Sequence, residues 1–260
     1  MTRSQVLVPG IVVAVWTMVA ASGLVSPLFV PAPWAVAARL ASLVWSGGLL
    51  AHAGATLGRA LVGFLIASVL GVAAGVPMGY WKRLDDLGKF TVDLFRSVPY
   101  TALFPLFLLF FGIGDVAKFA VCAWSGWLLV LVNTIYGVRH CLPTRRQVAQ
   151  TLRASHPQIL WKIVIPEAAP TIAAGLRIAL SVTIQAAVVV EMFMGTTSIG
   201  LGHLIYDAAV LSQAPEMYAG IITAGVMGYG VNAGFLLAEN RVLHWTQRKE
   251  PEHAIAQASS

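Results

Sequence analysis

The sequence predicts an all-α membrane protein with six transmembrane helices. Of its 260 residues, 58% are hydrophobic and only 11% are charged, whereas a soluble domain carries about 25% charged residues. The apolar residues gather in runs near the length of a membrane span, which needs about 20 apolar residues. These runs show no alternation of polar and apolar residues, so a β-barrel is not expected. The charges are also too few to build a basic face for nucleic acid, although the net charge is +6.

Six apolar segments are candidates for the spans. Five contain no charged residue, namely residues 6–25, 60–81, 97–114, 119–138 and 217–238. The sixth, residues 178–206, is interrupted by Glu191 and His203 and should hold one span followed by a glycine-rich turn. A signal peptide is the alternative for the first run, but that run exceeds the usual apolar length of about 7–15 residues. We therefore expect a retained helix.

The basic residues indicate the orientation of these spans. With the N-terminus inside, 14 of the 17 lysines and arginines fall on the inner side, and only Arg39, Arg59 and Lys118 fall outside. Cytoplasmic loops of membrane proteins carry an excess of Lys and Arg. We therefore expect both termini to be cytoplasmic.

The segments that connect the spans divide the chain into four predicted parts. The first part, residues 1–25, is the first transmembrane helix. Residues 26–58 form an outer connection, with a short helix that lies at the interface or only packs on its neighbours. A core with five transmembrane helices follows over residues 59–245, and its residues 82–90 are expected to form a charged inner loop. A flexible cytoplasmic tail covers residues 246–260.

The largest inner joint, residues 139–170, is predicted to be an ordered helical elbow. Residues 147–154 contain good helix formers, and Ser155 with Gln158 can make a capping box at the start of a second helix. Pro157 fits an early position of that helix, and Pro166 is expected to end it. Such an elbow is either a docking surface or a structural loop at the membrane interface.

The elbow resembles the EAA loop of the permease subunits of ABC importers. Ala149, Ile163 and Pro166 match the loop pattern, and Ile165 replaces its leucine. Three residues depart from the pattern: Gln147 stands for Glu, Val148 for Ala and Arg153 for Gly. We expect Arg153 to need only an ordinary helical conformation. The stretches around this loop resemble the nitrate, sulfonate and taurine branch of the same family, at residues 26–33, 95–106, 111–118, 174–180, 190–192 and 198–204.

The resemblance implies the type I importer fold with cytoplasmic coupling helices in a bacterial inner membrane. It implies a pair of permease chains, two ATP-binding cassette ATPase subunits, and a periplasmic or lipoprotein solute-binding protein. We expect the pair to be a homodimer, with a heterodimer as the alternative. This chain has no phosphate-binding loop, so ATP and Mg²⁺ are expected on the ATPase and no cofactor is expected here. The implied function is import of a small anionic solute (nitrate, a sulfonate, taurine or a similar organic acid) by alternating access. The chain itself is expected to be non-catalytic.

The residues expected to couple this chain to the ATPase lie in the elbow. They are Gln147, Ala149, Leu152, Arg153, Ala154, Ser155, Pro157, Ile159, Ile163 and Pro166. Among them, Leu152, Ala154 and Ile159 are candidates to insert into the ATPase cleft. Ser155 and Pro157 should set the angle between the two helices, and Arg153 should face an acidic partner surface.

The candidates for the translocation path are polar residues in or near the spans: Arg96, Asn133, Arg177, Gln185 and Glu191. Ionisable groups inside membranes are functional candidates by default, but each of these has a structural alternative. Arg96 and Arg177 either anchor the inner ends of spans or attract an anion. Asn133 and Gln185 either bond between helices or contact the solute. For Glu191 we favour a paired, structural role, because a bare carboxylate would repel an anion.

Two other classes of protein are alternatives to a permease subunit. A self-sufficient, ion-coupled secondary transporter would need charged residues in the middle of its spans, and Glu191 alone supports it weakly. An intramembrane enzyme would need a catalytic cluster that the sequence lacks. No histidine or cysteine spacing predicts a metal site, and the repeated glycines 71, 75 and 79 predict close helix packing.

Overall fold

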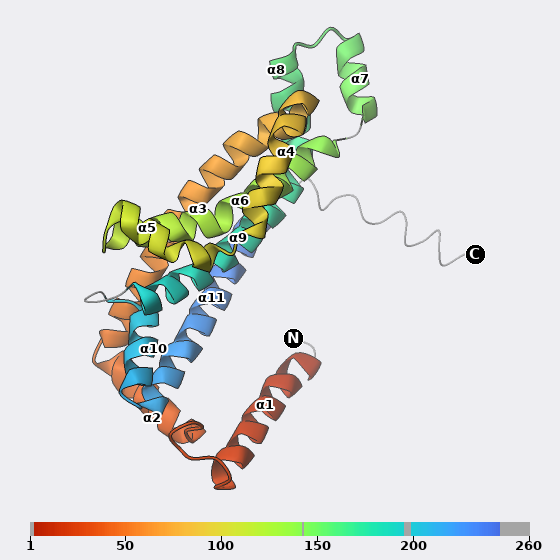
Figure 1. The fold of residues 1–260 in the computed structure, drawn as a ribbon. Coiled ribbons are helices and arrows are strands. Elements are labelled where there is room, and N and C mark those ends of the chain that lie inside the picture. The colour runs from red at the N-terminus through yellow and green to blue at the C-terminus, as the bar shows by residue number, and fades with distance from the viewer. Residues whose placement is uncertain (1–2, 142, 195–198, 245–260) are drawn as a thin grey trace. The chain divides into compact units, whose positions relative to one another are not determined.

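Every regular element in the described part of the computed structural model is a helix. The described residues are 3–141, 143–194 and 199–244, and Figure 1 shows their helices in chain order. The elements are α1 (Arg3–Ala21), α2 (Pro33–Trp45), α3 (Gly48–Tyr80), α4 (Lys82–Ser97), η1 (Tyr100–Leu103), α5 (Phe104–Phe111), α6 (Asp115–Arg139), α7 (Pro143–Thr151), α8 (His156–Ile159), η2 (Leu160–Val164), α9 (Ile165–Phe193), α10 (Leu201–Val210) and α11 (Ala214–Val242). The predicted tail 246–260 lies outside the described residues.

Four stretches of helix are long and apolar enough to cross a membrane. They are α3, α6, α11 and the run from α8 through α9, residues His156–Phe193. The segments Lys82–Ser97 and Tyr100–Phe111 meet the same criterion only as one pair, which is bent by 87°. The apolar part of α1, Leu7–Ala21, is shorter than these spans. The prediction of an all-helical membrane protein is confirmed, with four or five span-length segments in the described residues.

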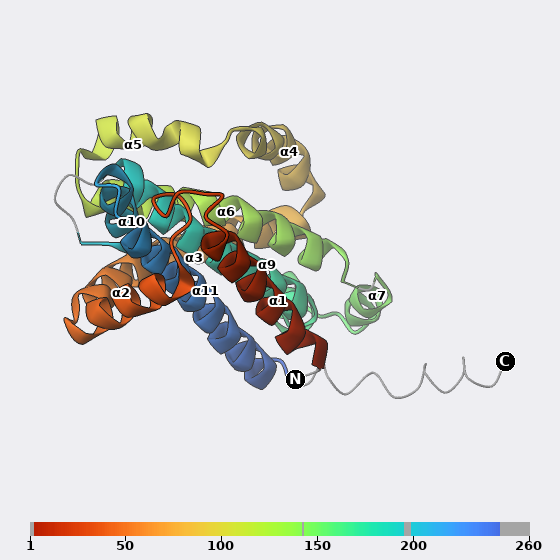
Figure 2. The ribbon, with the colours of Figure 1, turned by 90° about the horizontal axis from the view of Figure 1, so that it is seen from below.

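The region predicted as a charged loop and a straight span is built differently. Residues 82–90 belong to the helix α4, so the loop prediction was wrong. The helix α4 has its polar and apolar side chains on opposite faces. Asp85 lies in its first turn and Arg96 in its last turn, where a negative and a positive charge respectively stabilise a helix. The helix ends because Pro99 forces the preceding Val98 into an extended conformation. Figure 2 shows the resulting bend between α4 and α5.

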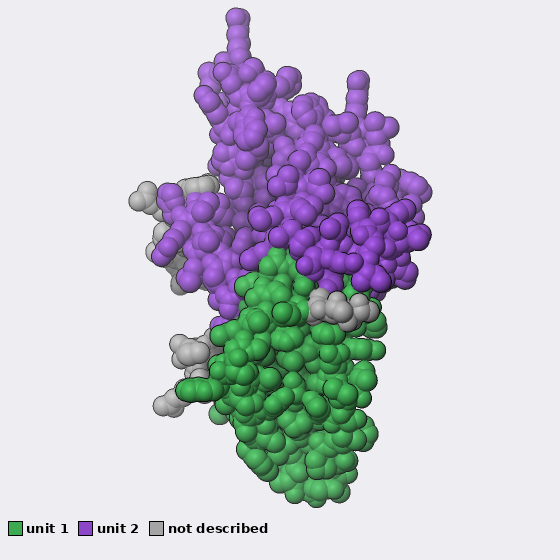
Figure 3. All heavy atoms as spheres, turned by 90° about the vertical axis from the view of Figure 1, so that its left-hand side faces the viewer, with its two compact units in different colours: residues 1–59, 187–228 green, residues 60–186, 229–260 purple. Residues whose placement is uncertain are grey.

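Contacts divide the chain into two compact units, which Figure 3 colours separately. The first contains residues 1–59 and 187–228, and the second contains residues 60–186 and 229–260. The first unit therefore combines the predicted outer connection with α10 and parts of α9 and α11.

Long-range contacts hold the first unit together. Trp16 of α1 donates a hydrogen bond to the carbonyl of Pro31 at 3.0 Å and stacks on Tyr218 of α11. Arg39 of α2 forms an ion pair with Glu216 at 2.6 Å. These contacts attach α1 and α2 to the start of α11.

In the second unit, α3 and α6 pack with little space between their backbones. A Cβ atom on Gly71 would lie 2.6 Å from Cβ of Val130, and one on Gly75 would lie 2.7 Å from Cβ of Thr134. A Cβ atom on Gly79 would lie 2.7 Å from Cβ of Val138, one turn further along α6. The predicted role of these three glycines in close packing is confirmed, because no larger side chain fits without moving α6.

Candidate functional site

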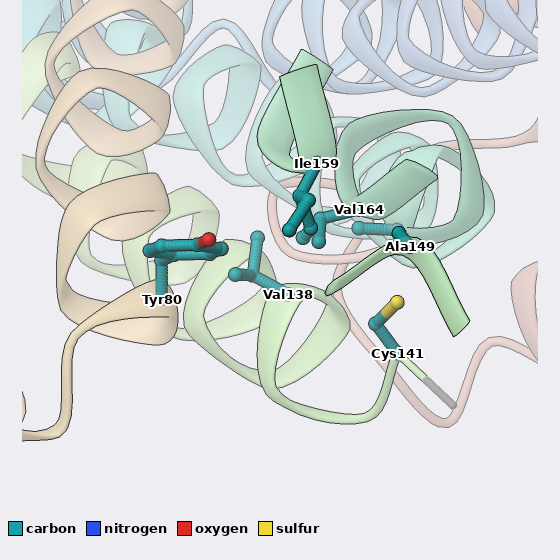
Figure 4. Packing of buried hydrophobic residues seen from close by; sticks show 7 residues of the cluster. Tyr80, Val138, Cys141, Ala149, Ile159 and Val164 are labelled. Carbon is teal, nitrogen blue, oxygen red and sulfur yellow. The ribbon is translucent and has the colours of Figure 1, made fainter. Parts of the chain in front are cut away.

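The predicted elbow has its own hydrophobic core. Figure 4 shows this elbow core, in which side chains from the ends of α3 and α6 meet α7, α8, η2 and the start of α9. Its buried members are Tyr80, Val138, Cys141, Ala149, Ile159, Val164 and Ala168. Ala154 and Ile163 pack against this cluster. The elbow is thus an ordered structure that is anchored to two long helices.

The helix α7 ends in a Schellman motif centred on Arg153. The amide of Arg153 bonds to the carbonyl of Gln150 at 2.9 Å, and the amide of Ala154 bonds to the carbonyl of Ala149 at 3.0 Å. This pair of bonds requires a left-handed residue after the helix, usually glycine, and Arg153 has a φ of 56°. The prediction that Arg153 adopts an ordinary helical conformation was wrong. It occupies a left-handed position at the place where the EAA pattern has glycine.

The helix α8 starts as its sequence predicts. Ser155 is its N-cap, and the amide of Ser155 donates to Oε1 of Gln158 at 2.9 Å within a capping box. Pro157 lies in the first turn, where its missing N–H group leaves no bond unmade. The hydroxyl group of Tyr80 lies 3.1 Å from Nδ1 of His156, which joins the start of α8 to the end of α3.

Pro166 does not end the second helix of the elbow. A π-helical turn, Leu160–Val164, precedes it, and the amide of Ile165 bonds to the carbonyl of Leu160. A proline inside a regular helix removes one hydrogen bond and clashes with the preceding turn. The widened turn admits the proline ring, so the helix continues directly into α9 and the predicted break was wrong.

An apolar groove lies in the elbow, between side chains of α7 and Ile163 of η2. It has a volume of about 310 Å³ and is lined by Thr144, Arg145, Val148, Ala149, Leu152 and Ile163. Leu152 is 77% exposed and Val148 is 55% exposed. Trp161 of η2 is also 68% exposed. Val148 and Trp161 were not among the predicted coupling residues, although both are large apolar residues in a polar segment.

The structure separates the predicted coupling residues into two groups. Ala149 and Ile159 are buried in the elbow core, and Ala154 and Ile163 pack on it. Ile159 is only 2% exposed, so the expectation that it inserts into a partner was wrong. Those with exposed side chains are Gln147, Leu152, Arg153, Ser155, Pro157 and Pro166.

Two of the predicted path residues lie together in the second unit. Arg96 and Asn133 line one cavity of about 530 Å³, which is walled by the end of α4, the following bend, α6 and one residue of α9. The side-chain amide of Asn133 also donates to the carbonyl of Leu129 at 2.8 Å. The other candidates in this unit do not line the cavity: Arg177 lies 3.7 Å from Glu239, and Gln185 is exposed on α9.

Glu191, in the first unit, is the centre of a buried polar cluster. Its side chain is fully buried, and Oε1 accepts a hydrogen bond from Nη1 of Arg59 at 2.7 Å. Oε2 accepts from the hydroxyl group of Thr56 at 2.7 Å and from the amide of Gly202 at 3.0 Å. A carboxylate with these partners is fully bonded, which is the condition for burying a charge.

The same cluster holds residues 199–202, at the start of α10. Arg59 donates to the carbonyl of Ile199 at 2.6 Å, and the hydroxyl group of Thr56 accepts from the amide of Leu201 at 2.8 Å. A Cβ atom on Gly202 would meet Cβ of Glu191 at 2.7 Å, so the segment approaches as closely as its glycine permits. Arg59 was expected on the outer side, at the first residue of the predicted core 59–245. It lies within α3, and only the isolated Glu191 hinted at a basic partner.

Known proteins are similar in sequence to this chain over nearly its whole length. The family model described as "Binding-protein-dependent transport system inner membrane component" matches residues 67–240. The putative aliphatic sulfonates transport permease protein SsuC of Bacillus subtilis is 32% identical over 94% of this chain and 88% of its own length. The taurine transport system permease protein TauC of Escherichia coli is 29% identical over 90% of this chain and 86% of its own length.

A solved structure shares the fold. A chain of the MetNI methionine ABC transporter in an inward-facing conformation superposes with a TM-score of 0.66 at 19% sequence identity. The match covers 78% of this chain and 97% of the MetNI chain. The family match and the similarity to SsuC establish that this chain belongs to the binding-protein-dependent transport system inner membrane components, the integral permease subunits of ABC importers.

Proposed function

We propose that this chain imports a small anionic solute and that a separate ATPase drives it through the elbow. The observation that carries the proposal is the exposed Leu152 beside an apolar groove, on an elbow that has its own core. A soluble surface loop gains nothing from an apolar groove, whereas a partner that covers the groove removes it from water. The elbow therefore has the order and the surface that docking requires.

The proposed assembly contains two copies of this chain, two ATP-binding cassette ATPase subunits and a periplasmic or lipoprotein solute-binding protein. ATP and Mg²⁺ are held by the ATPase. In this proposal α1 and the bent α4–α5 pair join the four long helical stretches to make six membrane segments. The excess of inner Lys and Arg residues supports cytoplasmic termini and a cytoplasmic elbow.

The proposed mechanism is alternating access. Closure of the ATPase subunits around ATP moves the elbows, and the spans follow as rigid bodies until the path opens outward. Hydrolysis of ATP reverses the movement. The continuous helix from α8 through η2 into α9 supports this proposal, because an unbroken helix passes a displacement on without an intervening hinge.

The anionic nature of the solute rests on the related permeases and on one charge. SsuC and TauC are named for aliphatic sulfonates and taurine, which carry a sulfonate group. In this chain Arg96 lines the largest of the cavities described above, and a guanidinium group binds such oxyanions. We propose that Arg96 and Asn133 face the translocation path. The bonded Glu191 and the paired Arg177 are assigned structural roles.

A substitution at Leu152 tests the coupling. The permease would be purified with its ATPase subunits and reconstituted with the solute-binding protein. Leu152→Asp should abolish solute-stimulated ATP hydrolysis and release the ATPase during purification, because it places a charge in the apolar contact. Leu152→Met keeps the apolar bulk and serves as the control. Wild-type activity in the Leu152→Asp complex would refute the docking role of the elbow.

The same preparation tests the alternative of a self-sufficient, ion-coupled transporter. Vesicles that contain the permease without its ATPase should show no uptake, with or without an ion gradient. Uptake that follows the gradient and needs no nucleotide would favour the alternative.

A further inference from the structure

We propose that the cavity beside Arg96 binds organic anions with a bulky, preferably aromatic, body and discriminates against small inorganic oxyanions. This proposal rests on the proposed function, because the cavity is taken to be part of the solute path. It goes further by naming the chemical class of solute from the wall of the cavity.

The size of the cavity is the first argument. Its volume of about 530 Å³ lies within the range of about 300–1,000 Å³ that is typical of sites for drug-sized molecules. Nitrate, with four heavy atoms, would leave most of this space to water. An arenesulfonate or a long-chain sulfonate would fill much more of it, and burial of the apolar part would contribute to binding.

The wall of the cavity is the second argument. Aromatic side chains from three segments line it: Phe95 from α4, Tyr100 from η1 and Trp124 from α6. The rings of Phe95 and Trp124 pack edge to face, with their centroids 5.3 Å apart. Trp124 in turn contacts Trp127 at 5.6 Å. These rings hold one another in place and present a preformed apolar surface, on which an aromatic ring of the solute can stack.

The charges of the cavity are the third argument. Arg96 is the one charged side chain among the described residues that line it. Arg96 pairs with the carboxylate of Asp93 at 4.0 Å, and both side chains are more than half exposed. An exposed pair of this kind is weak, so the guanidinium group can bind an incoming anion. Asp93 lines a neighbouring cavity.

The hydrogen-bonding groups that line the cavity support the same class of solute, an organic anion with an apolar body. The amide of Asn133 is already bonded to the backbone, and the hydroxyl group of Ser125 donates to the carbonyl of Cys122 at 2.8 Å. The polar groups are thus few, and they lie in a mainly apolar wall. Such a wall suits a solute with one charged head and an apolar body, whereas a solute with polar groups all round would leave many of them without partners.

Arg96 also connects two cavities. Together with Val132 it lines the neighbouring cavity of about 180 Å³, where Asp85, Lys89 and Arg139 carry both signs of charge. An anion bound to Arg96 therefore has a polar, charged region next to it. This arrangement gives the head group a route out of the apolar cavity.

Equilibrium binding to the permease in its complex with the ATPase tests the proposal directly, without nucleotide and without the solute-binding protein. The probes are radiolabelled benzenesulfonate, methanesulfonate and nitrate. Benzenesulfonate should bind at one site per chain and at least tenfold more tightly than the other two. Arg96→Gln should weaken it at least tenfold, and Arg96→Lys should restore part of the loss.

Two further variants complete the design. Arg83→Gln removes the same charge from the same helix at a position that lines none of the described cavities, and it should leave binding unchanged. Trp124→Ala should weaken benzenesulfonate while leaving methanesulfonate unchanged, whereas Trp124→Phe should retain most of the binding. Equal affinity for benzenesulfonate and nitrate would overturn the proposal, and so would binding that is indifferent to Arg96. The Leu152→Asp experiment does not depend on this cavity, so failure here would leave the coupling proposal standing.

Discussion

Nη1 of Arg59 lies 2.7 Å from Oε1 of Glu191, in an ion pair whose side chains are 9% and 0% exposed. The two residues are far apart in the sequence and come from α3 and α9. Through Thr56 and the backbone of Ile199, Leu201 and Gly202, this pair also fixes the segment that leads into α10.

The first prediction concerns this pair. Glu191→Ala should lower the free energy of unfolding by about 3–5 kcal/mol, because it leaves Arg59 buried without its counter-charge. The double variant Arg59→Met with Glu191→Leu should recover most of the loss, since no charge then stays buried. Thermal unfolding in detergent measures both. A double variant as unstable as Glu191→Ala would contradict this account.

The second prediction concerns the left-handed Arg153. A non-glycine residue pays about 1–2 kcal/mol in this conformation, so Arg153→Gly should stabilise the end of α7 by about 1 kcal/mol. Hydrogen exchange of the amides at 153 and 154 should slow by about fivefold, as this free energy implies. Arg153→Ala is the control, because it removes the side chain without removing the backbone strain. Equal protection in the two variants would show that the side chain, and not the backbone, decides stability.

The third prediction concerns the cap of α8. Ser155→Ala should destabilise the start of this helix by about 1 kcal/mol, because the amide of Gln158 loses its acceptor. The effect should appear as faster exchange of that amide, while the amides of α6 stay protected. Ser155→Asp retains a capping oxygen and should behave like the wild type. Unchanged exchange in Ser155→Ala would mean that the elbow core alone holds α8.

The fourth prediction concerns the contact between α3 and α6. Gly75→Ala should destabilise the protein by about 1–3 kcal/mol, because the added Cβ would lie 2.7 Å from Cβ of Thr134 and 2.9 Å from the carbonyl of Leu131. Gly54→Ala on the same helix meets no atom within 4 Å and should be neutral or stabilising, since alanine favours helices. Thermal unfolding compares the two, and an equal response would argue against close packing at Gly75.

Local signals in the sequence predicted the elbow well. The capping pair of Ser155 and Gln158 and the early Pro157 act within a single turn, so the start of α8 could be predicted from neighbouring residues. The stripe formed by Gly71, Gly75 and Gly79 is equally local. It predicts a close packing surface, although the sequence does not name α6 as the helix that packs there.

Two features of the elbow could not be predicted from local preferences. One depends on tertiary packing and the other on an irregular helical turn. Arg153 takes a left-handed conformation that its side chain disfavours, and the elbow core around Ala149 and Ala154 compensates for it. Pro166 is accommodated by the π-helical turn before it. A rule that prolines end helices does not include this adjustment.

The remaining errors arise from long-range pairing. Glu191 is unusual within an apolar run, but the sequence does not show that its partner is Arg59, which lies 132 residues away. The bend after Ser97 has a local cause in Pro99. It was not predicted, because residues 97–114 contain no charge and have the length of a straight span. The candidate cavity depends on the same bend, so only the structure brings Arg96, Asn133 and Trp124 together.

The π-helical turn has a mechanical consequence. Because Leu160–Val164 widens the helix without interrupting it, α8 and the part of α9 that belongs to the second unit form one continuous helix. In the proposed coupling, a tilt of this helix about His156 would displace residues in proportion to their distance from it, so the part of α9 in the second unit would move further than the elbow itself.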